Sequence, residues 1–265
     1  MNSCSIYLNR GEDERIRRGH VWVYNNEISR IEGRIESGNL GDVYSQDGCY
    51  LGQGFVNSAS KIFVRIISRD QDVKIDDAYF EKKLLAARKR REDMGMKDTY
   101  RACFGEADGI PGLIVDKYSD YLVVQFLSLG VEKRAKAITE SLVRIYKPKG
   151  IYERSDVPAR EKEGLEQRTG LLYGDVPDRV EIKEGGLGLL VDLKNGQKTG
   201  SYLDQRENHL AITSFVKGKR VLDCFSHDGN FGLQAKLAGA REVICVDISK
   251  DACQGLRKTP CITVS

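Results

Sequence analysis

The sequence predicts a protein of mixed α/β and α+β class, with a small N-terminal β-barrel, a central α+β domain and the opening of a doubly wound parallel sheet. Three observations predict this fold class. Short segments that alternate apolar and polar residues occupy residues 5–70, strands and helices mix irregularly over 100–190, and a buried strand, a helix and a second buried strand follow one another after residue 207. A chain of 265 residues is long enough for two or three such domains.

The composition excludes several classes of protein. No run of about 18 apolar residues occurs, and the first residues lack the apolar core of a signal peptide, so no membrane partner is expected. The seven cysteines form no C-x-x-C pair and the three histidines are widely spaced, which predicts reduced thiols in a cytoplasmic protein and no metal site. With 42 Lys and Arg against 39 Asp and Glu, nucleic-acid binding would depend on local basic patches.

The first domain, residues 1–72, is predicted to be the barrel. Asp47-Gly48 is a hairpin signal between two alternating segments. Apolar residues at helical spacing then predict a helix over 76–95, closed by Gly95. This change from strands to a helix places a domain boundary near residue 72. The expected strands lie within residues 5–8, 20–28, 39–56 and 61–68.

The second domain, residues 73–190, is predicted to be α+β, because its strands and helices do not alternate regularly. After the helix of residues 76–95, two neighbouring strands are expected to pair as a hairpin, followed by a helix and further β structure. These expected elements are strands at 112–116 and 121–127, a helix over 131–146, a strand at 151–157 and β structure within 171–177 and 180–193.

The third region, residues 191–265, carries the strongest chemical signal. Two buried strands are expected at 218–225 and 241–248, and each ends at an acid, Asp223 or Asp247. Ligands bind at the carboxyl ends of parallel strands, so Asp247 is placed to accept hydrogen bonds from the two hydroxyls of a ribose. Gly229, in the turn after the first strand, leaves room for a ligand near the backbone. The helices of this region are expected over 207–216 and 229–240.

The same sequence pattern has three alternative interpretations besides a nucleoside-binding site. The pattern is also compatible with a purely structural βαβ unit. A dinucleotide site is disfavoured because the turn has only Gly229 and Gly232 of a G-x-G-x-x-G fingerprint, and a triphosphate site because no G-x-x-x-x-G-K-[ST] occurs. A loop that begins at an acid suits a cationic ligand better than a pyrophosphate, and S-adenosylmethionine (SAM) has that charge.

The stretch VLDCFSHDGNFGLQAKLAGAREVICVDIS at 221–249 resembles motifs I and II of class I SAM-dependent methyltransferases. Three further stretches make the resemblance more specific: RRGHVWVYNNEI at 17–28, GEADGIPGLIVDKYSDYLVVQ at 105–125 and NGQKTGSYLDQRENH at 195–209. Together they resemble the PUA-domain methyltransferases that modify carbon-5 of a cytosine in large-subunit ribosomal RNA.

This resemblance implies a PUA RNA-binding domain over 1–72, the family's central domain over 73–190, and the N-terminal part of a SAM-binding, Rossmann-like methyltransferase domain over 191–265. The implied cofactor is SAM and the implied partner is ribosomal RNA; a homodimer is left open. The implied cofactor-binding residues are Gln197, Lys198, Thr199, Gly200, Tyr202, Leu203, Asp204, Gln205, Arg206, Asp223, Phe225, Asp228, Gly229, Phe231 and Asp247.

Two basic clusters are candidates for phosphate contacts, because cationic side chains release counterions when they bind nucleic acid. One lies in the turn 17–20 and the other on the helix of residues 76–95, for which an ordinary solvated helix face is an equal alternative. The candidate residues are Arg17, Arg18, His20, Arg88, Arg90 and Arg91.

The catalytic residues are unknown. Enzymes of this family attack carbon-6 of cytosine with a cysteine thiolate and orient the base with an acid, typically in an Asp-Pro-Pro turn, which this sequence lacks. Pro260-Cys261 is interpreted as part of a tail, and Cys224 and Cys245 as core residues of buried strands. We therefore expect a chain truncated within its catalytic domain, with an exposed edge at 221–225, weakened SAM affinity and no methyl transfer by itself. The alternative function is that of a non-catalytic PUA-type RNA-binding protein; a nicotinamide-dependent oxidoreductase is disfavoured.

Overall fold

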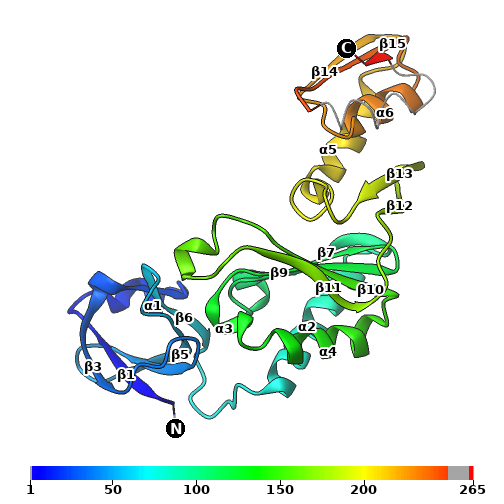
Figure 1. The fold of residues 1–265 in the computed structure, drawn as a ribbon. Coiled ribbons are helices and arrows are strands. Elements are labelled where there is room, and N and C mark those ends of the chain that lie inside the picture. The colour runs from blue at the N-terminus through cyan, green and yellow to red at the C-terminus, as the bar shows by residue number, and fades with distance from the viewer. Residues whose placement is uncertain (1, 250–262, 265) are drawn as a thin grey trace. The chain divides into compact units, whose positions relative to one another are not determined.

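A computed structural model describes residues 2–249 and 263–264 of the chain (Figure 1). The chain divides into two compact units, Met1–Pro177 and Asp178–Ser265. Within the described residues, no helix combines the length and the apolar character that a membrane crossing requires. In the same residues, no cluster of three or more His, Cys, Asp or Glu side chains could hold a metal ion.

The N-terminal part of the first unit is a six-stranded sheet that curves around one apolar core. Its strand order is β2-β6-β5-β4-β1-β3, in which only β1 and β4 are parallel. The predicted barrel is thus an open half-barrel with β2 and β3 as its edges. Its elements are β1 (Cys4–Leu8), α1 (Asp13–Arg17), β2 (Trp22–Tyr24), η1 (Asn25–Glu27), β3 (Ile28–Gly33), β4 (Leu40–Tyr44), β5 (Tyr50–Val56) and β6 (Ile62–Ser68).

The same unit continues with a five-stranded sheet of order β11-β10-β9-β8-β7, packed against two long helices (Figure 1). As predicted, β8 and β9 form a hairpin. Asp76 caps α2 by accepting a hydrogen bond from the Tyr79 amide at 3.1 Å. The elements are α2 (Asp77–Asp93), β7 (Thr99–Phe104), η2 (Gly105–Asp108), β8 (Leu113–Tyr118), β9 (Tyr121–Phe126), α3 (Leu129–Glu132), α4 (Ala135–Tyr146), β10 (Gly150–Ser155), η3 (Glu161–Glu163) and β11 (Arg168–Gly174).

Two details of this region differ from the sequence expectation. Strand β7 was not predicted, because its short segment carries a charged residue, Arg101. The cost of placing this arginine on a buried strand is offset by its bidentate ion pair with Asp116 on β8. The single helix expected over 131–146 is divided into α3 and α4. The break coincides with Arg134, whose guanidinium donates to the carbonyls of Gly38 and Gly130, each at 2.9 Å.

A buried polar cluster joins the half-barrel to the five-stranded sheet. Glu163, on η3, accepts hydrogen bonds from Asn57, Ser60 and Arg65 of the half-barrel. Glu106, on η2, accepts one from the indole of Trp22 at 2.8 Å. These contacts are one reason why residues 1–177 form one compact unit.

The second unit combines a β-hairpin with a three-stranded parallel sheet of order β14-β15-β16, against which α6 packs. The strand-helix-strand order predicted from the sequence is present. The helix expected over 207–216 is α5, continued by a 3-10 turn. The elements are β12 (Arg179–Glu184), β13 (Leu187–Asp192), η4 (Leu203–Gln205), α5 (Arg206–Ala211), η5 (Ile212–Ser214), β14 (Arg220–Cys224), α6 (Asn230–Leu237), β15 (Glu242–Val246) and β16 (Thr263–Val264).

The expectation of a buried strand at 218–225 was wrong, whereas β14 is an edge strand of its sheet, as expected for 221–225. Asp223 faces α6 and is buried, whereas Leu222 is 62% exposed and Cys224 is also exposed. The reason is that, within residues 178–249 and 263–264, helix α6 covers only one face of the sheet. Cys224 is therefore not a core residue, whereas Cys245 on β15 is fully buried, as predicted.

Candidate functional site at the carboxyl edge of the parallel sheet

Two acids lie at the same edge of the parallel sheet. The register pairs Asp223 with Cys245, so the carboxyl ends of β14 and β15 lie side by side. Asp223 is buried and its Oδ2 accepts the amide of Gly232, in the first turn of α6, at 3.0 Å. Asp247 follows β15 directly and remains partly accessible. The edge therefore presents one accessible carboxylate beside one that anchors the helix.

The loop between β14 and α6 has an unusual backbone. Phe225, His227 and Gly229 all have positive φ, at 59°, 47° and 70°. Left-handed backbone costs a non-glycine residue about 1 kcal/mol or more, so this conformation must be held by its surroundings. The Ser226 amide donates to the carbonyl of Val246 at 3.1 Å, which fixes the loop to the end of β15.

Asp247 holds the same loop through its carboxylate. Its Oδ2 accepts the His227 amide at 2.7 Å and its Oδ1 accepts the Ser249 amide at 2.8 Å. These two backbone hydrogen bonds lower the pKa of the Asp247 carboxyl below its ordinary value. The carboxylate thus stays ionised at neutral pH, and an ionised carboxylate is an acceptor suited to ligand hydroxyls.

The pKa values of Asp223 and His227, at the same edge, are raised rather than lowered. Burial raises the pKa of the Asp223 carboxyl, and the nearby Asp247 charge adds to that effect. The hydrogen bond to Asp228, with Nδ1 and Oδ2 3.0 Å apart, raises the pKa of His227. The three carboxylates around the loop, Asp223, Asp228 and Asp247, outnumber its one imidazole, which gives the edge a negative character that suits a cationic ligand.

The segment before the sheet reaches this loop through an aromatic contact. The rings of Tyr202 and His227 meet edge to face with centroids 5.4 Å apart. The Tyr202 hydroxyl donates to Gln197 at 2.5 Å, and the Lys198 ammonium lies 4.2 Å from the Tyr202 ring centre. The ammonium is also 3.7 Å from Asp204. Two of the predicted stretches, 195–209 and 221–249, are therefore brought together.

The remaining predicted cofactor residues lie on these same two stretches. Thr199 is buried, and Gly200 has a φ of 136° and little room for a Cβ, which would come within 2.8 Å of Val191. Leu203 and Gln205 lie on η4, and Arg206 begins α5. That all of them bind the cofactor remains a prediction.

Phe231 is supported by residues that the sequence reasoning missed. Its ring meets His209 edge to face at 4.4 Å. His209 Nδ1 lies 2.6 Å from Glu184 Oε1, and both side chains are buried. Gln234 donates to the backbone carbonyl of Glu184 at 2.8 Å. The sequence around His209 does not identify Glu184 as its partner, because the two residues are 25 positions apart.

The candidate RNA-contacting residues of the half-barrel lie at its surface. Arg17 and Arg18 pair with Asp13 and Glu14 one helical turn earlier, and both guanidiniums are largely exposed. The Nδ1 of His20 accepts the amide of Trp22 at 3.1 Å. Surface pairs of this kind are weak, so both arginines can exchange their carboxylates for phosphates.

The three candidate arginines of α2 have unequal surroundings. Arg91 is only 11% exposed and donates two hydrogen bonds to the buried carboxylate of Asp108, at 2.5 and 2.6 Å. Arg90 contacts the same carboxylate at 2.9 Å but is 56% exposed. Arg88 pairs with Glu92 at the surface. Arg88 and Arg90 therefore remain open to a ligand, whereas Arg91 has a structural partner. Cys261, interpreted above as part of a tail, lies outside the described residues.

Comparison with known proteins first defines the class of fold. Residues 6–69 match a model of a PUA-like domain. A protein from Streptococcus mutans assigned as a SAM-dependent methyltransferase superposes with a TM-score of 0.81 at 21% identity, covering 98% of this chain and 69% of that one. A further crystal structure, of an assigned methyltransferase in complex with SAH, gives a TM-score of 0.82 at 21% identity. The chain thus combines a PUA-like domain with the fold of these two solved structures.

Sequence relatives then specify the family. The chain is 42% identical over 255 residues to ribosomal RNA large subunit methyltransferase I of Aeromonas hydrophila and 43% identical over 252 residues to that of Aliivibrio fischeri. Each match covers 94% of this chain and 64% of the relative, so the chain spans slightly less than two thirds of their length. The chain is thus similar to ribosomal RNA large subunit methyltransferase I proteins, as the resemblance described above predicts, and the names of these relatives do not specify the methylated base.

Proposed function

We propose that the chain binds SAM at the carboxyl edge of β14 and β15 and serves in the SAM-dependent methylation of large-subunit ribosomal RNA, with carbon-5 of a cytosine as the target. The single observation that carries this proposal is the ionised Asp247 carboxylate beside the positive-φ loop 225–229. A carboxylate at the end of the second strand is suited to the two hydroxyls of a ribose. The names of the relatives and the SAH complex of the structural neighbour support the same assignment.

The charge of the edge favours SAM over a dinucleotide. Asp223, Asp228 and Asp247 all lie around the loop, where a pyrophosphate would meet repulsion and a sulfonium or an amino group would be attracted. Tyr202 and Phe231 supply aromatic surface on the two stretches that meet there. SAM, when bound, would supply the methyl group; these residues would bind and orient it.

The first test is calorimetric titration of SAM, SAH and NAD into the wild-type chain and the variant Asp247→Ala. Loss of two charge-assisted hydrogen bonds should weaken SAM binding by roughly 10- to 100-fold. Glu242→Gln is a matched control, because Glu242 is an acid at the opposite end of the same strand, where it pairs with Arg220. Equal SAM affinities for wild type and Asp247→Ala, or tighter binding of NAD than of SAM, would contradict the proposal.

A non-catalytic RNA-binding protein is the second candidate, and the PUA-like match supports it. It predicts RNA binding that needs Arg17 and Arg18 but no affinity for SAM. The target base rests on the family resemblance, and incubation of ribosomal RNA with SAM and this chain tests it together with the expectation that the chain alone transfers no methyl group. A methylated base other than cytosine would contradict the target, and a methylated cytosine would contradict the expected lack of transfer. A cytoplasmic location and a homodimer belong to the proposal as well; the first follows from a ribosomal substrate, and light scattering tests the second.

A further inference from the structure

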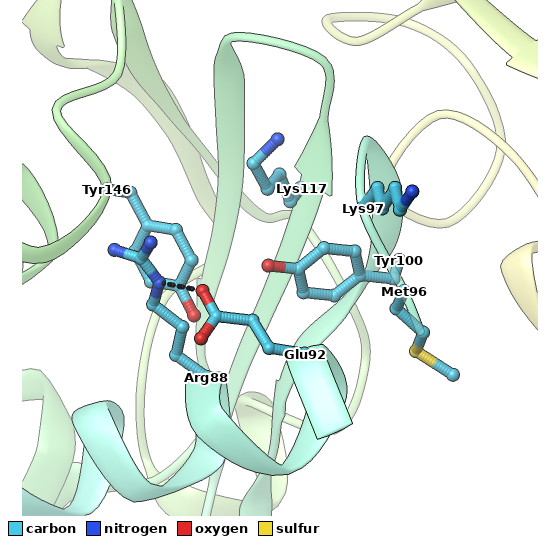
Figure 2. A pocket seen from close by; sticks show the side chains of 7 residues that line it. All are labelled: Arg88, Glu92, Met96, Lys97, Tyr100, Lys117 and Tyr146. Carbon is cyan, nitrogen blue, oxygen red and sulfur yellow. Dashed lines mark hydrogen bonds and ion pairs between the residues drawn. The ribbon is translucent and has the colours of Figure 1, made fainter. Parts of the chain in front are cut away.

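A polar pocket of about 330 Å³ lies in the first unit, between the end of α2, the strands β7 and β8 and the end of α4 (Figure 2). Three cationic side chains and one carboxylate contribute to its lining, so its net charge is positive. Two tyrosines, Tyr100 and Tyr146, face the same space. The lining residues are Arg88, Glu92, Met96, Lys97, Tyr100, Lys117 and Tyr146.

The cations of the pocket keep donor capacity for a ligand. Lys117 donates to the carbonyls of Asp98 and Ser119, at 3.2 and 2.6 Å, which uses two of the three hydrogens of its ammonium. Arg88 donates from Nε to Glu92 and from Nη1 to the carbonyl of Ile145, so Nη2 remains for a ligand. Lys97 also lines the pocket and is exposed. These donors come from separate elements that line one pocket.

The two tyrosines add neutral donors. Figure 2 shows the Glu92 carboxylate between the two rings, with the Tyr100 hydroxyl directed toward that side of the pocket. Burial raises the pKa of both Tyr100 and Tyr146, so both hydroxyls stay protonated at neutral pH. Ammonium, guanidinium and hydroxyl donors around one pocket suit the oxygens of a phosphate, and the single carboxylate, Glu92, is already paired with Arg88.

We propose that this pocket binds a backbone phosphate of an RNA strand through Lys97, Lys117, Arg88 and Tyr100. The inference rests on the proposed RNA substrate and extends it to a defined contact outside the half-barrel. It also differs from binding to a solvated helix face, because Tyr100 and Lys117 belong to β7 and β8. Free phosphate has the same chemistry, so the test must separate the two sources.

The experiment measures fluorescence anisotropy of a labelled single-stranded RNA over a series of salt concentrations, with the full 265-residue chain. Lys97→Glu removes an exposed ammonium that no described contact requires, and should weaken binding about tenfold and reduce the salt slope by about one. Tyr100→Phe keeps the charge and the ring, and should weaken binding about fivefold with an unchanged slope. Lys162→Glu, an exposed lysine outside the pocket, is the matched control and should change affinity by about twofold at most.

The outcomes separate this inference from the proposed function. Wild-type affinity in both Lys97→Glu and Tyr100→Phe would overturn the pocket while leaving the RNA substrate intact. A loss in Lys162→Glu as large as that in Lys97→Glu would also overturn it, because the effect would then be general charge. Calorimetric binding of inorganic phosphate that Lys97→Glu abolishes, with RNA binding unchanged, would assign the pocket to free phosphate and refute the RNA contact. A wild-type chain that binds SAM but no RNA would refute the proposed substrate itself.

Discussion

Replacement of Glu163 by glutamine should destabilise the first unit strongly, although the change is nearly isosteric. Glu163 is buried, and its Oε1 accepts hydrogen bonds from Ser60 and Arg65, each at 2.6 Å, while Oε2 accepts one from Asn57 at 3.2 Å. A glutamine turns one acceptor into a donor and leaves Arg65 without its nearest negative charge. Arg65 keeps one further carboxylate, because Glu106 lies 3.5 Å from it.

The size of the effect follows from these contacts. Loss of one partner of a buried ion pair typically costs about 3–5 kcal/mol. The second carboxylate beside Arg65 reduces that cost, so we expect a loss of about 2–3 kcal/mol in the free energy of unfolding. With a urea dependence of about 2 kcal/mol per molar, the unfolding midpoint should fall by about 1–1.5 M.

The assay uses the only tryptophan of the chain, Trp22, as a reporter of the first unit. Its indole donates to Glu106 and its ring lies 5.6 Å from the Arg65 guanidinium, so its fluorescence senses this cluster directly. Glu161→Gln is the matched control, because Glu161 is two residues away and exposed. A midpoint for Glu163→Gln within about 0.3 M of the Glu161→Gln midpoint would refute the reasoning, because an exposed carboxylate contributes little. A double variant with Arg65→Met should show a coupling of at least about 1 kcal/mol.

Two further predictions concern other parts of the chain. Gly232→Ala should destabilise the second unit by about 1–3 kcal/mol in thermal unfolding, because the added Cβ would lie 2.5 Å from the Cys245 sulfur; an unchanged midpoint would show that the helix can shift freely. Arg91→Met should cost about 3 kcal/mol at neutral pH and Arg90→Met less than about 1 kcal/mol. Burial raises the pKa of Asp108, but the Arg91 hydrogen bonds outweigh burial and hold this pKa below its ordinary value of 3.8. The stabilisation from the Arg91–Asp108 pair is therefore present above pH 3.8 and is lost as the pH falls through the lowered pKa. A cost of Arg91→Met that does not shrink in acid would contradict that linkage.

The order of the elements could be predicted from the sequence, because periodicity depends on neighbouring residues. Asp223 and Asp247 were assigned to the ends of two parallel strands from the apolar runs before them, and the register confirms that they share an edge. The cap of α2 at Asp76 and the β8–β9 hairpin have equally local causes.

The partners of residues that are far apart in the chain could not be predicted from the sequence. Nothing local distinguishes Arg91, which binds the buried Asp108, from Arg90, which is exposed one position earlier. The burial of Glu184 beside His209 likewise depends on how the β12–β13 hairpin packs against α5 and α6. The exposure of Leu222 depends on which face of the sheet has a covering helix. The apolar character of the strand does not identify which face of the sheet the helix covers.

Asp247 has two separate roles that a single alanine substitution does not distinguish. Its carboxylate is the proposed ribose acceptor, and it also accepts the amides of His227 and Ser249. The loop contains two non-glycine residues with positive φ, which together cost on the order of 2 kcal/mol. The His227 hydrogen bond, with those of Ser226 and Gly229, offsets that cost before any ligand arrives. The edge is therefore preorganised, and Asp247→Ala removes both the ligand's acceptor and the support of the loop. Asp247→Asn keeps one oxygen for the His227 amide; if it restores the stability of the second unit but not SAM affinity, the direct role is the dominant one.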